Sequence, residues 1–127
     1  MAVARSCNPG NGAVDLAVSA GEYLEYTVPS ADANVRFALA ESGGGSLFDN
    51  TTCPPPCAFR WPAQGTAIGA GEARHTLSMQ FFGDERLAYR VVRRSAVGSV
   101  LEVVKDCAFE NTGGPDEYFE PLRVFVS

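Results

Sequence analysis

The sequence predicts an all-β fold, an antiparallel β-sandwich or jelly-roll-like domain of seven to eight strands with little or no helix. Apolar and polar residues alternate with period two along most of the chain, as in strands that bury one face. No segment of helical length repeats apolar residues at i, i+3, i+4 and i+7. Clusters of glycine and proline separate the alternating runs. Because 127 residues suit one domain, residues 1–127 are expected to form a single β-sandwich.

The first part of the chain holds three alternating runs. Apolar side chains fall at every second position in residues 14–18, 23–28 and 35–39. Residues 29–34, between the second and third runs, are rich in turn-forming residues. Each run is therefore expected to form a strand with one face in the core.

The region from about Glu41 to Glu72 shows no such alternation and is long for a connection within one domain. Irregular loops longer than ~15 residues are uncommon in compact domains and are usually functional. Residues Ala58–Trp61 are the candidate for a short strand inside this region.

The second part of the chain alternates again. Residues 76–81 and 87–91 flank Gly83–Glu85, which predicts a turn between two strands. In the following run, Leu101–Phe109, the odd-numbered positions are expected to share one face. Residues 122–126 form the last predicted strand.

Four cysteines in a small chain favour two disulfides. Of three pairings we expect Cys53–Cys57, which closes a small ring, and Cys7–Cys107. A redox role is disfavoured because the Cys-Pro-Pro-Pro-Cys segment has one residue more than Cys-x-x-Cys and no predicted helix follows it. A zinc site is disfavoured because only one cysteine pair is close and the chain has one histidine, His75.

Disulfides imply an oxidising compartment. The N-terminal sequence MAVARSCNPG lacks the apolar region of an intact secretory signal. We therefore expect a secreted, extracellular or periplasmic protein whose signal is absent from this sequence, with a virion component or a cytosolic protein as alternatives.

The charge of the chain bears on its partners. A formal net charge of -5 argues against a nucleic-acid partner, whose phosphates require a basic face. It also disfavours anionic membrane surfaces. No apolar run approaches the ~18 residues that a membrane-spanning helix needs, so no membrane insertion is expected.

The segment from Phe48 to Gly65, FDNTTCPPPCAFRWPAQG, is the candidate binding loop. It holds the only tryptophan, Trp61, beside Arg60, with Phe59 and Phe48 as further candidates. An exposed tryptophan on a rigid loop can stack on a sugar ring or fill a pocket of a partner protein. The alternative is that Trp61 belongs to the core and closes one end of the sandwich.

Two further features carry titratable groups. Asp116, Glu117 and Glu120 are a candidate calcium site, since calcium takes six to eight oxygen ligands, and a solvated acidic turn is the competing interpretation. No other metal or cofactor is expected. His75 shares a strand face with apolar residues and is expected to be a hydrogen-bonded structural residue rather than a general base.

The sequence thus predicts a non-catalytic extracellular binding or adhesion module that binds carbohydrate or protein through residues 48–65. The alternative is a structural or assembly protein that self-associates, such as a capsid decoration, surface-layer or filament subunit. A small carboxylate-dependent hydrolase is the third hypothesis, because Asp and Glu are plentiful. With no nucleophile motif and one histidine, an enzyme is not expected.

Overall fold

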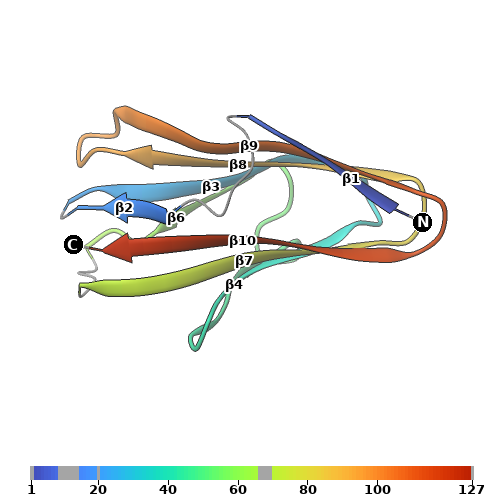
Figure 1. Cartoon of the computed structure of the whole chain (residues 1–127), viewed down its shortest axis with the longest axis horizontal. Coiled ribbons are helices and arrows are strands. Elements are labelled where there is room, and N and C mark those ends of the chain that lie inside the picture. The colour runs from blue at the N-terminus through green and yellow to red at the C-terminus, as the bar shows by residue number, and fades with distance from the viewer. Residues whose placement is uncertain (1, 9–14, 20, 66–69, 127) are drawn as a thin grey trace.

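Two β-sheets pack face to face in the computed structural model, which describes residues 2–8, 15–19, 21–65 and 70–126 (Figure 1). Sheet A has the strand order β1-β9-β8-β3-β6, and sheet B has the order β2-β10-β7-β4-β5. These residues contain no helix, and so none that could cross a membrane. The predicted all-β sandwich is confirmed, with more strands than the seven to eight expected. The strands are β1 (Ala2–Cys7), β2 (Asp15–Val18), β3 (Tyr23–Ala31), β4 (Arg36–Glu41), β5 (Gly45–Asp49), β6 (Cys57–Trp61), β7 (Gly71–Phe81), β8 (Glu85–Arg94), β9 (Val100–Thr112) and β10 (Asp116–Val126).

The additional strands lie where the local sequence pattern is least informative. β6 is the short strand expected within the irregular region. β1 has the sequence AVARSC and β5 has GSLFD, neither of which alternates large apolar and polar side chains. β1 pairs with β9, and β5 pairs with β4. These two strands are therefore defined by the partners they meet in the folded chain.

One strand pair departs from the predicted antiparallel arrangement. β2 runs parallel to β10, whereas the other strand pairs among the described residues are antiparallel. β2 pairs only with Arg123–Val126, so the earlier part of β10, including Glu120 and Pro121, lies beyond it. Proline has no N–H to donate to a neighbouring strand, which suits this uncovered position.

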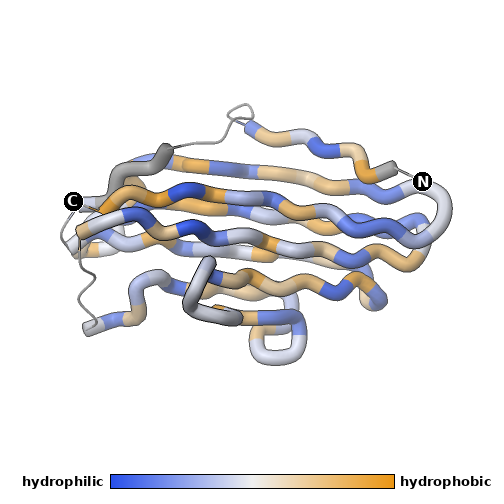
Figure 2. The backbone as a smooth tube through the Cα atoms, turned by 60° about the horizontal axis from the view of Figure 1, so that its bottom comes forward, coloured by the Kyte–Doolittle hydropathy of each residue, from blue (hydrophilic) through white to orange (hydrophobic). Residues whose placement is uncertain are grey.

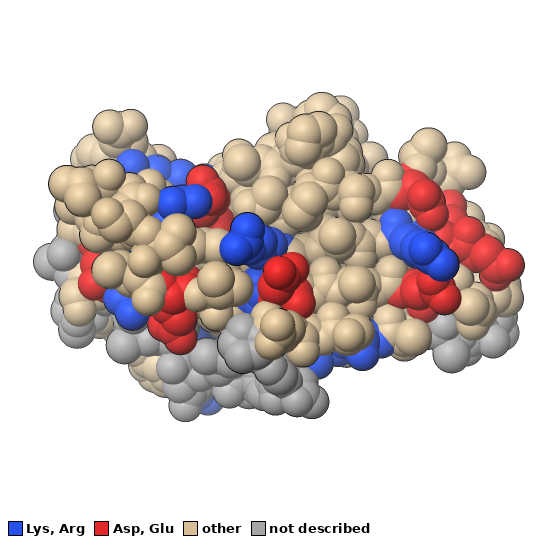
Figure 3. Space-filling model, turned by 90° about the horizontal axis from the view of Figure 1, so that it is seen from above, with Lys and Arg blue, Asp and Glu red and all other residues tan. Residues whose placement is uncertain are grey.

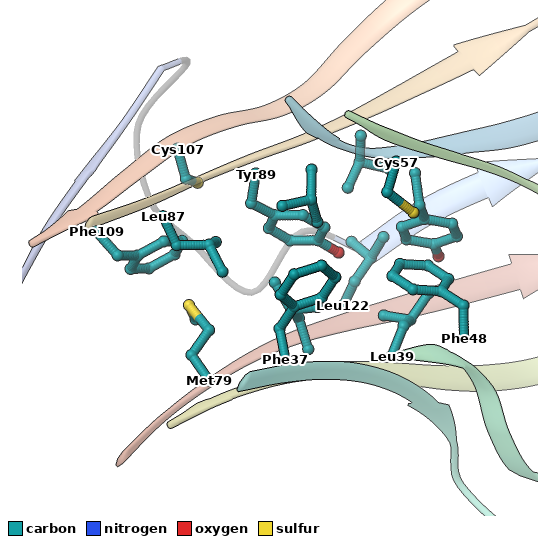
Figure 4. Packing of buried hydrophobic residues seen from close by; sticks show 14 of the residues in the cluster. Phe37, Leu39, Phe48, Cys57, Met79, Leu87, Tyr89, Cys107, Phe109 and Leu122 are labelled. Atoms are coloured by element: carbon teal, nitrogen blue, oxygen red, sulfur yellow. The ribbon is translucent and has the colours of Figure 1, made fainter. Parts of the chain in front are cut away.

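The core lies between the sheets and is built from alternate residues of the central strands (Figure 2, Figure 4). Leu24, Tyr26 and Val28 of β3 have no exposed surface, while the residues between them are only partly buried. Burying each large apolar side chain contributes about 1.5–3 kcal/mol, so this stripe dominates the stability of the sandwich. The core also includes Phe37, Leu39, Leu77, Met79, Phe81, Leu87, Tyr89, Val91, Phe109, Leu122 and Val124.

A β-bulge in β9 changes which residues face the core. Val91 pairs with Lys105, but the next residue of β8, Val92, pairs with Val103, so Val104 has no partner of its own. Val104 and Lys105 are consequently both buried, and Leu101 is 45% exposed. The expectation that odd-numbered positions share one face from Leu101 to Phe109 is wrong before the bulge and correct after it.

The structure contains two disulfides, with the pairing expected from the sequence. Cys7–Cys107 joins two directly paired positions of β1 and β9, and Cys53–Cys57 closes a small ring that leads into β6. The described cysteines include none that is free. Disulfides are compatible with an extracellular location.

Candidate functional site

The tryptophan of the candidate binding loop is a core residue. Trp61 is 8% exposed, and its ring meets the edge of the His75 ring at a centroid distance of 4.4 Å. Phe48 is 3% exposed and packs against Phe37. The expectation that Trp61 and Phe48 present a ligand-binding surface is therefore corrected: pairing of β6 with β3 directs Trp61 into the core.

The other two candidates in this loop are also engaged within the molecule. The half-buried Phe59 packs against Phe48, with ring centroids 5.2 Å apart. The guanidinium of Arg60 lies 3.9 Å from the ring centroid of Tyr23. The Cys53–Cys57 disulfide ring contains three prolines and leads directly into β6, an edge strand of sheet A.

His75 is held by hydrogen bonds at both ring nitrogens, as expected for a structural residue. The hydroxyl of Tyr26 donates to Nδ1, and Nε2 donates to Glu41 over 3.0 Å. The carboxylate can only accept, which places the ring proton on Nε2. Burial lowers the pKa of His75, against the opposing effect of Glu41, and burial raises the pKa of Tyr26. His75 and Tyr26 have no exposed surface, so neither can reach a ligand.

The structure does not bring the three carboxylates of the calcium candidate together. Glu117 is exposed, whereas Glu120 is 2% exposed and points into the protein. Asp116 accepts a hydrogen bond from the backbone N–H of Glu117. Over the described ranges, no group of three or more His, Cys, Asp or Glu side chains is arranged to hold a metal ion.

Glu120 instead belongs to a buried ionic cluster that connects the sheets. Arg5 donates two hydrogen bonds to its carboxylate, at 2.6 and 2.9 Å, and the Lys105 Nζ donates a third at 2.5 Å. Lys105 also donates to the carbonyl of Pro121 over 2.7 Å. Burial acts to raise the pKa of Glu120, but the hydrogen bonds from both cations outweigh it and the pKa is lowered. The carboxylate is therefore already satisfied.

The outer face of sheet B carries a hollow that follows from the strand register. Arg36, Gln80 and Glu117 occupy paired positions across β4, β7 and β10. The next row places Ala38 and Ser78 beside the aromatic Phe119. The small side chains in the middle of the second row leave a floor between larger neighbours. The resulting hollow has a volume of about 310 Å³.

Phe119 has an exposure unusual for a large apolar residue in mid-strand. Its side chain is 58% exposed because it lies on the outward face of β10, between Tyr118 and Glu120, which face inward. Asp49 and Asn50, from the end of β5 and the following turn, line the hollow opposite β10. The start of the candidate loop at 48–65 thus does border this site, through its polar residues.

A second hollow adjoins the first at the end of the sheet. It has a volume of about 450 Å³ and shares Arg36 and Asn50 with the first. Asn34 and the aromatic Phe82, which is 45% exposed, complete it. We call the two hollows together the sheet B groove. The polar and aromatic side chains that line it are Asn34, Arg36, Asp49, Asn50, Ser78, Gln80, Phe82, Glu117 and Phe119.

The outer face of sheet A is different in character. Seen from the side on which β8 and β9 lie, cationic and anionic side chains alternate in small clusters (Figure 3). Arg86 pairs with Glu110, and Arg93 pairs with Glu22 and Glu102. A hollow of about 510 Å³ on this face is lined by alanine or serine at half of its positions. Its charged residues are paired, Arg5 with Glu120 and Arg86 with Glu110, and its one aromatic residue, Phe109, is buried. This hollow therefore presents no exposed aromatic ring to a ligand.

Sequence reasoning missed Phe119, Phe82, Arg36, Gln80 and Asn34 as site residues. A signal for Phe119 was present, since adjacent Tyr118 and Phe119 cannot both face the core of a regular strand. The meeting of Arg36, Gln80 and Glu117 depends on the register of three strands and has no local signal.

Comparison of the chain with protein-family models, with curated proteins and with solved structures finds no match.

Proposed function

We propose that the protein is a non-catalytic extracellular binding module that holds a glycan in the sheet B groove. The observation that carries the proposal is Phe119, an exposed ring fixed in mid-strand beside hydrogen-bonding side chains and above a floor of small residues. The proposed ligand surface is therefore the outer face of sheet B, which the 48–65 loop borders, and not the aromatic residues of that loop.

The chemistry of the groove suits a sugar ring. A pyranose has an apolar C–H face that packs on an aromatic ring and hydroxyl groups around its edge that need donors and acceptors. Phe119 supplies the ring, Gln80 supplies an amide that donates and accepts, and Glu117 supplies a carboxylate. A volume of about 310 Å³ lies at the small end of ligand pockets, so a single ring fits.

The compartment agrees with this assignment. Two disulfides favour export to an oxidising environment, and we infer a secreted, extracellular or periplasmic location, with a virion component as the alternative.

Substituting Phe119→Ala tests the proposal in a glycan-binding assay followed by titration calorimetry. Loss of the ring is expected to weaken binding by about 1–3 kcal/mol, or roughly 5- to 150-fold, by analogy with stacked aromatic contacts. Phe119→Tyr should retain most of the affinity. Leu101→Ala truncates another exposed apolar side chain, 45% exposed against 58% for Phe119, on the opposite sheet; it is the matched control and should leave glycan binding unchanged. Equal binding by Phe119→Ala and Leu101→Ala would contradict the proposal.

Self-association is a second candidate function, favoured by one observation. The tip of the β8–β9 hairpin exposes three apolar residues, with Val97 88%, Val100 52% and Leu101 45% exposed. Grouped apolar residues of this kind often mark interaction surfaces. Under this hypothesis the protein forms oligomers in sedimentation velocity that Val97→Ser with Val100→Ser disperses, and a monomer at every concentration tested would exclude it.

A further inference from the structure

We propose that the Arg36 end of the sheet B groove is a subsite for the carboxylate of an acidic sugar. This inference rests on the proposed glycan-binding function and deepens it by assigning the charge class of the ligand.

Among the residues that the structure describes, Arg36 differs from most arginines in forming no salt bridge. Its guanidinium lies 5.7 Å from the centroid of the Phe82 ring. By contrast, salt bridges to glutamate are made by Arg5, Arg74, Arg86, Arg93, Arg94 and Arg123. An exposed guanidinium without a carboxylate keeps its charge and its donors available.

Two acidic residues near Arg36, Asp49 and Glu85, accept hydrogen bonds from backbone N–H groups. Asp49 accepts from the N–H groups of Thr51 and Thr52, each at 2.8 Å. Glu85, the first residue of β8, accepts from the N–H groups of Phe82 and Gly83. Both carboxylates keep their charge, but no salt bridge joins either of them to Arg36 among the described residues, so the donors of its guanidinium are not taken up by them.

The surroundings of Arg36 favour recognition of a planar anion. Contact with Phe82 limits the orientations of the guanidinium, so that less conformational entropy is lost when a ligand binds. The amides of Asn34 and Asn50 line the same hollow and can donate to ligand oxygens. A carboxylate is the group that a guanidinium holds through two parallel hydrogen bonds.

The groove has a positive charge at one end and a negative charge at the other, and this difference should orient a charged ligand. Glu117 lies two strands from Arg36 in the same row, separated by Gln80. An acidic ring is therefore expected beside Arg36, and a neutral ring on Phe119, where a second carboxylate would meet Glu117. The net charge of -5 does not prevent this, because at physiological salt charges are screened beyond about 8 Å.

The experiment compares uronic-acid oligosaccharides with the same oligosaccharides after reduction of their carboxyl groups to neutral sugars. The wild-type protein should prefer the acidic forms, and Arg36→Gln should weaken their binding by about 10- to 100-fold while leaving the neutral forms unaffected. Arg90→Gln is the matched control, since Arg90 is exposed on the outer face of the other sheet. Calorimetry at physiological salt separates this contact from general charge attraction.

The outcomes for the subsite and for the glycan-binding function are distinguishable. Equal affinity for acidic and reduced forms, or no loss in Arg36→Gln, overturns the subsite. If Phe119→Ala weakens binding at the same time, the proposed glycan-binding function stands without the subsite. Absence of binding to every acidic and neutral oligosaccharide overturns both.

Discussion

At the scale of single residues, His75 shows how burial turns a titratable side chain into a structural one. Tyr26 and Glu41 fix its neutral tautomer, and the Trp61 ring packs against it at nearly a right angle. A charged ring would place a proton on Nδ1, so that the Tyr26 hydroxyl could no longer donate to it. The array therefore favours the neutral imidazole.

Protein stability should consequently depend on pH through His75. Because its pKa in the folded protein is lowered from about 6.5, the unfolded state binds more protons below that value. The contribution of His75 to the free energy of unfolding is then expected to be complete above about pH 6.5. It should decrease as the pH falls below that value. Urea unfolding from about pH 7 to about pH 5.5 measures this decline, and Tyr26→Phe, which frees Nδ1 to accept a proton, should change its slope. A flat profile in the wild type would count against the neutral assignment.

Glu120 is the second residue whose burial matters. Its carboxylate holds two cations, and removal of its charge leaves Lys105, which is 2% exposed, without a counter-charge. Glu120→Gln is expected to destabilise the fold by about 3–5 kcal/mol, the usual cost of breaking a buried pair. Glu110→Gln removes an exposed partner of Arg86 and should cost about 0–1 kcal/mol.

Denaturant midpoints of the two variants decide the matter, and similar values would show that the cluster contributes no more than a surface pair. Because the pKa of Glu120 is lowered in the folded protein, its contribution to the free energy of unfolding is present above about pH 4.5. That contribution is lost as the pH falls further.

At the scale of the element, alternation predicted the long strands and failed where the partner strand decides. Residues 23–28 and 76–81 alternate because each has one face in the core, and both are strands. The bulge at Val104 reverses the faces of β9, and it follows from the fit between β8 and β9 rather than from any local signal. Lys105 has the same parity as Cys107 and Phe109 and faces inward to meet Glu120, whereas the bulge before it turns Leu101 outward.

The two disulfides act on elements of very different span. Cys7–Cys107 closes a separation of 100 residues, and Cys53–Cys57 closes a separation of 4. In the chain-entropy model their removal costs about 4–5 and about 2 kcal/mol respectively. Guanidinium unfolding of the two double-serine variants tests this order. A larger loss from the small ring would mean that its bracing of β6 outweighs the entropic effect.

At the scale of the whole molecule, the two outer faces have different properties. Sheet A presents paired charges and the apolar tip of the β8–β9 hairpin. Sheet B presents the groove, with the exposed rings of Phe119 and Phe82 and with Arg36, which lines both of its hollows. The sequence was sufficient for the fold class, the disulfide pairing and the structural role of His75. It was not sufficient for the groove, because the groove exists only where β4, β7 and β10 bring their outward residues into register.

The central claim is that ligand is bound on the outer face of sheet B. Backbone amide shifts followed by nuclear magnetic resonance during titration with a bound glycan test it most directly. The expected result is a set of perturbed amides confined to β4, β7, the first half of β10 and the turn at Asn50. Perturbations centred on the 95–101 hairpin tip or on sheet A would contradict the claim.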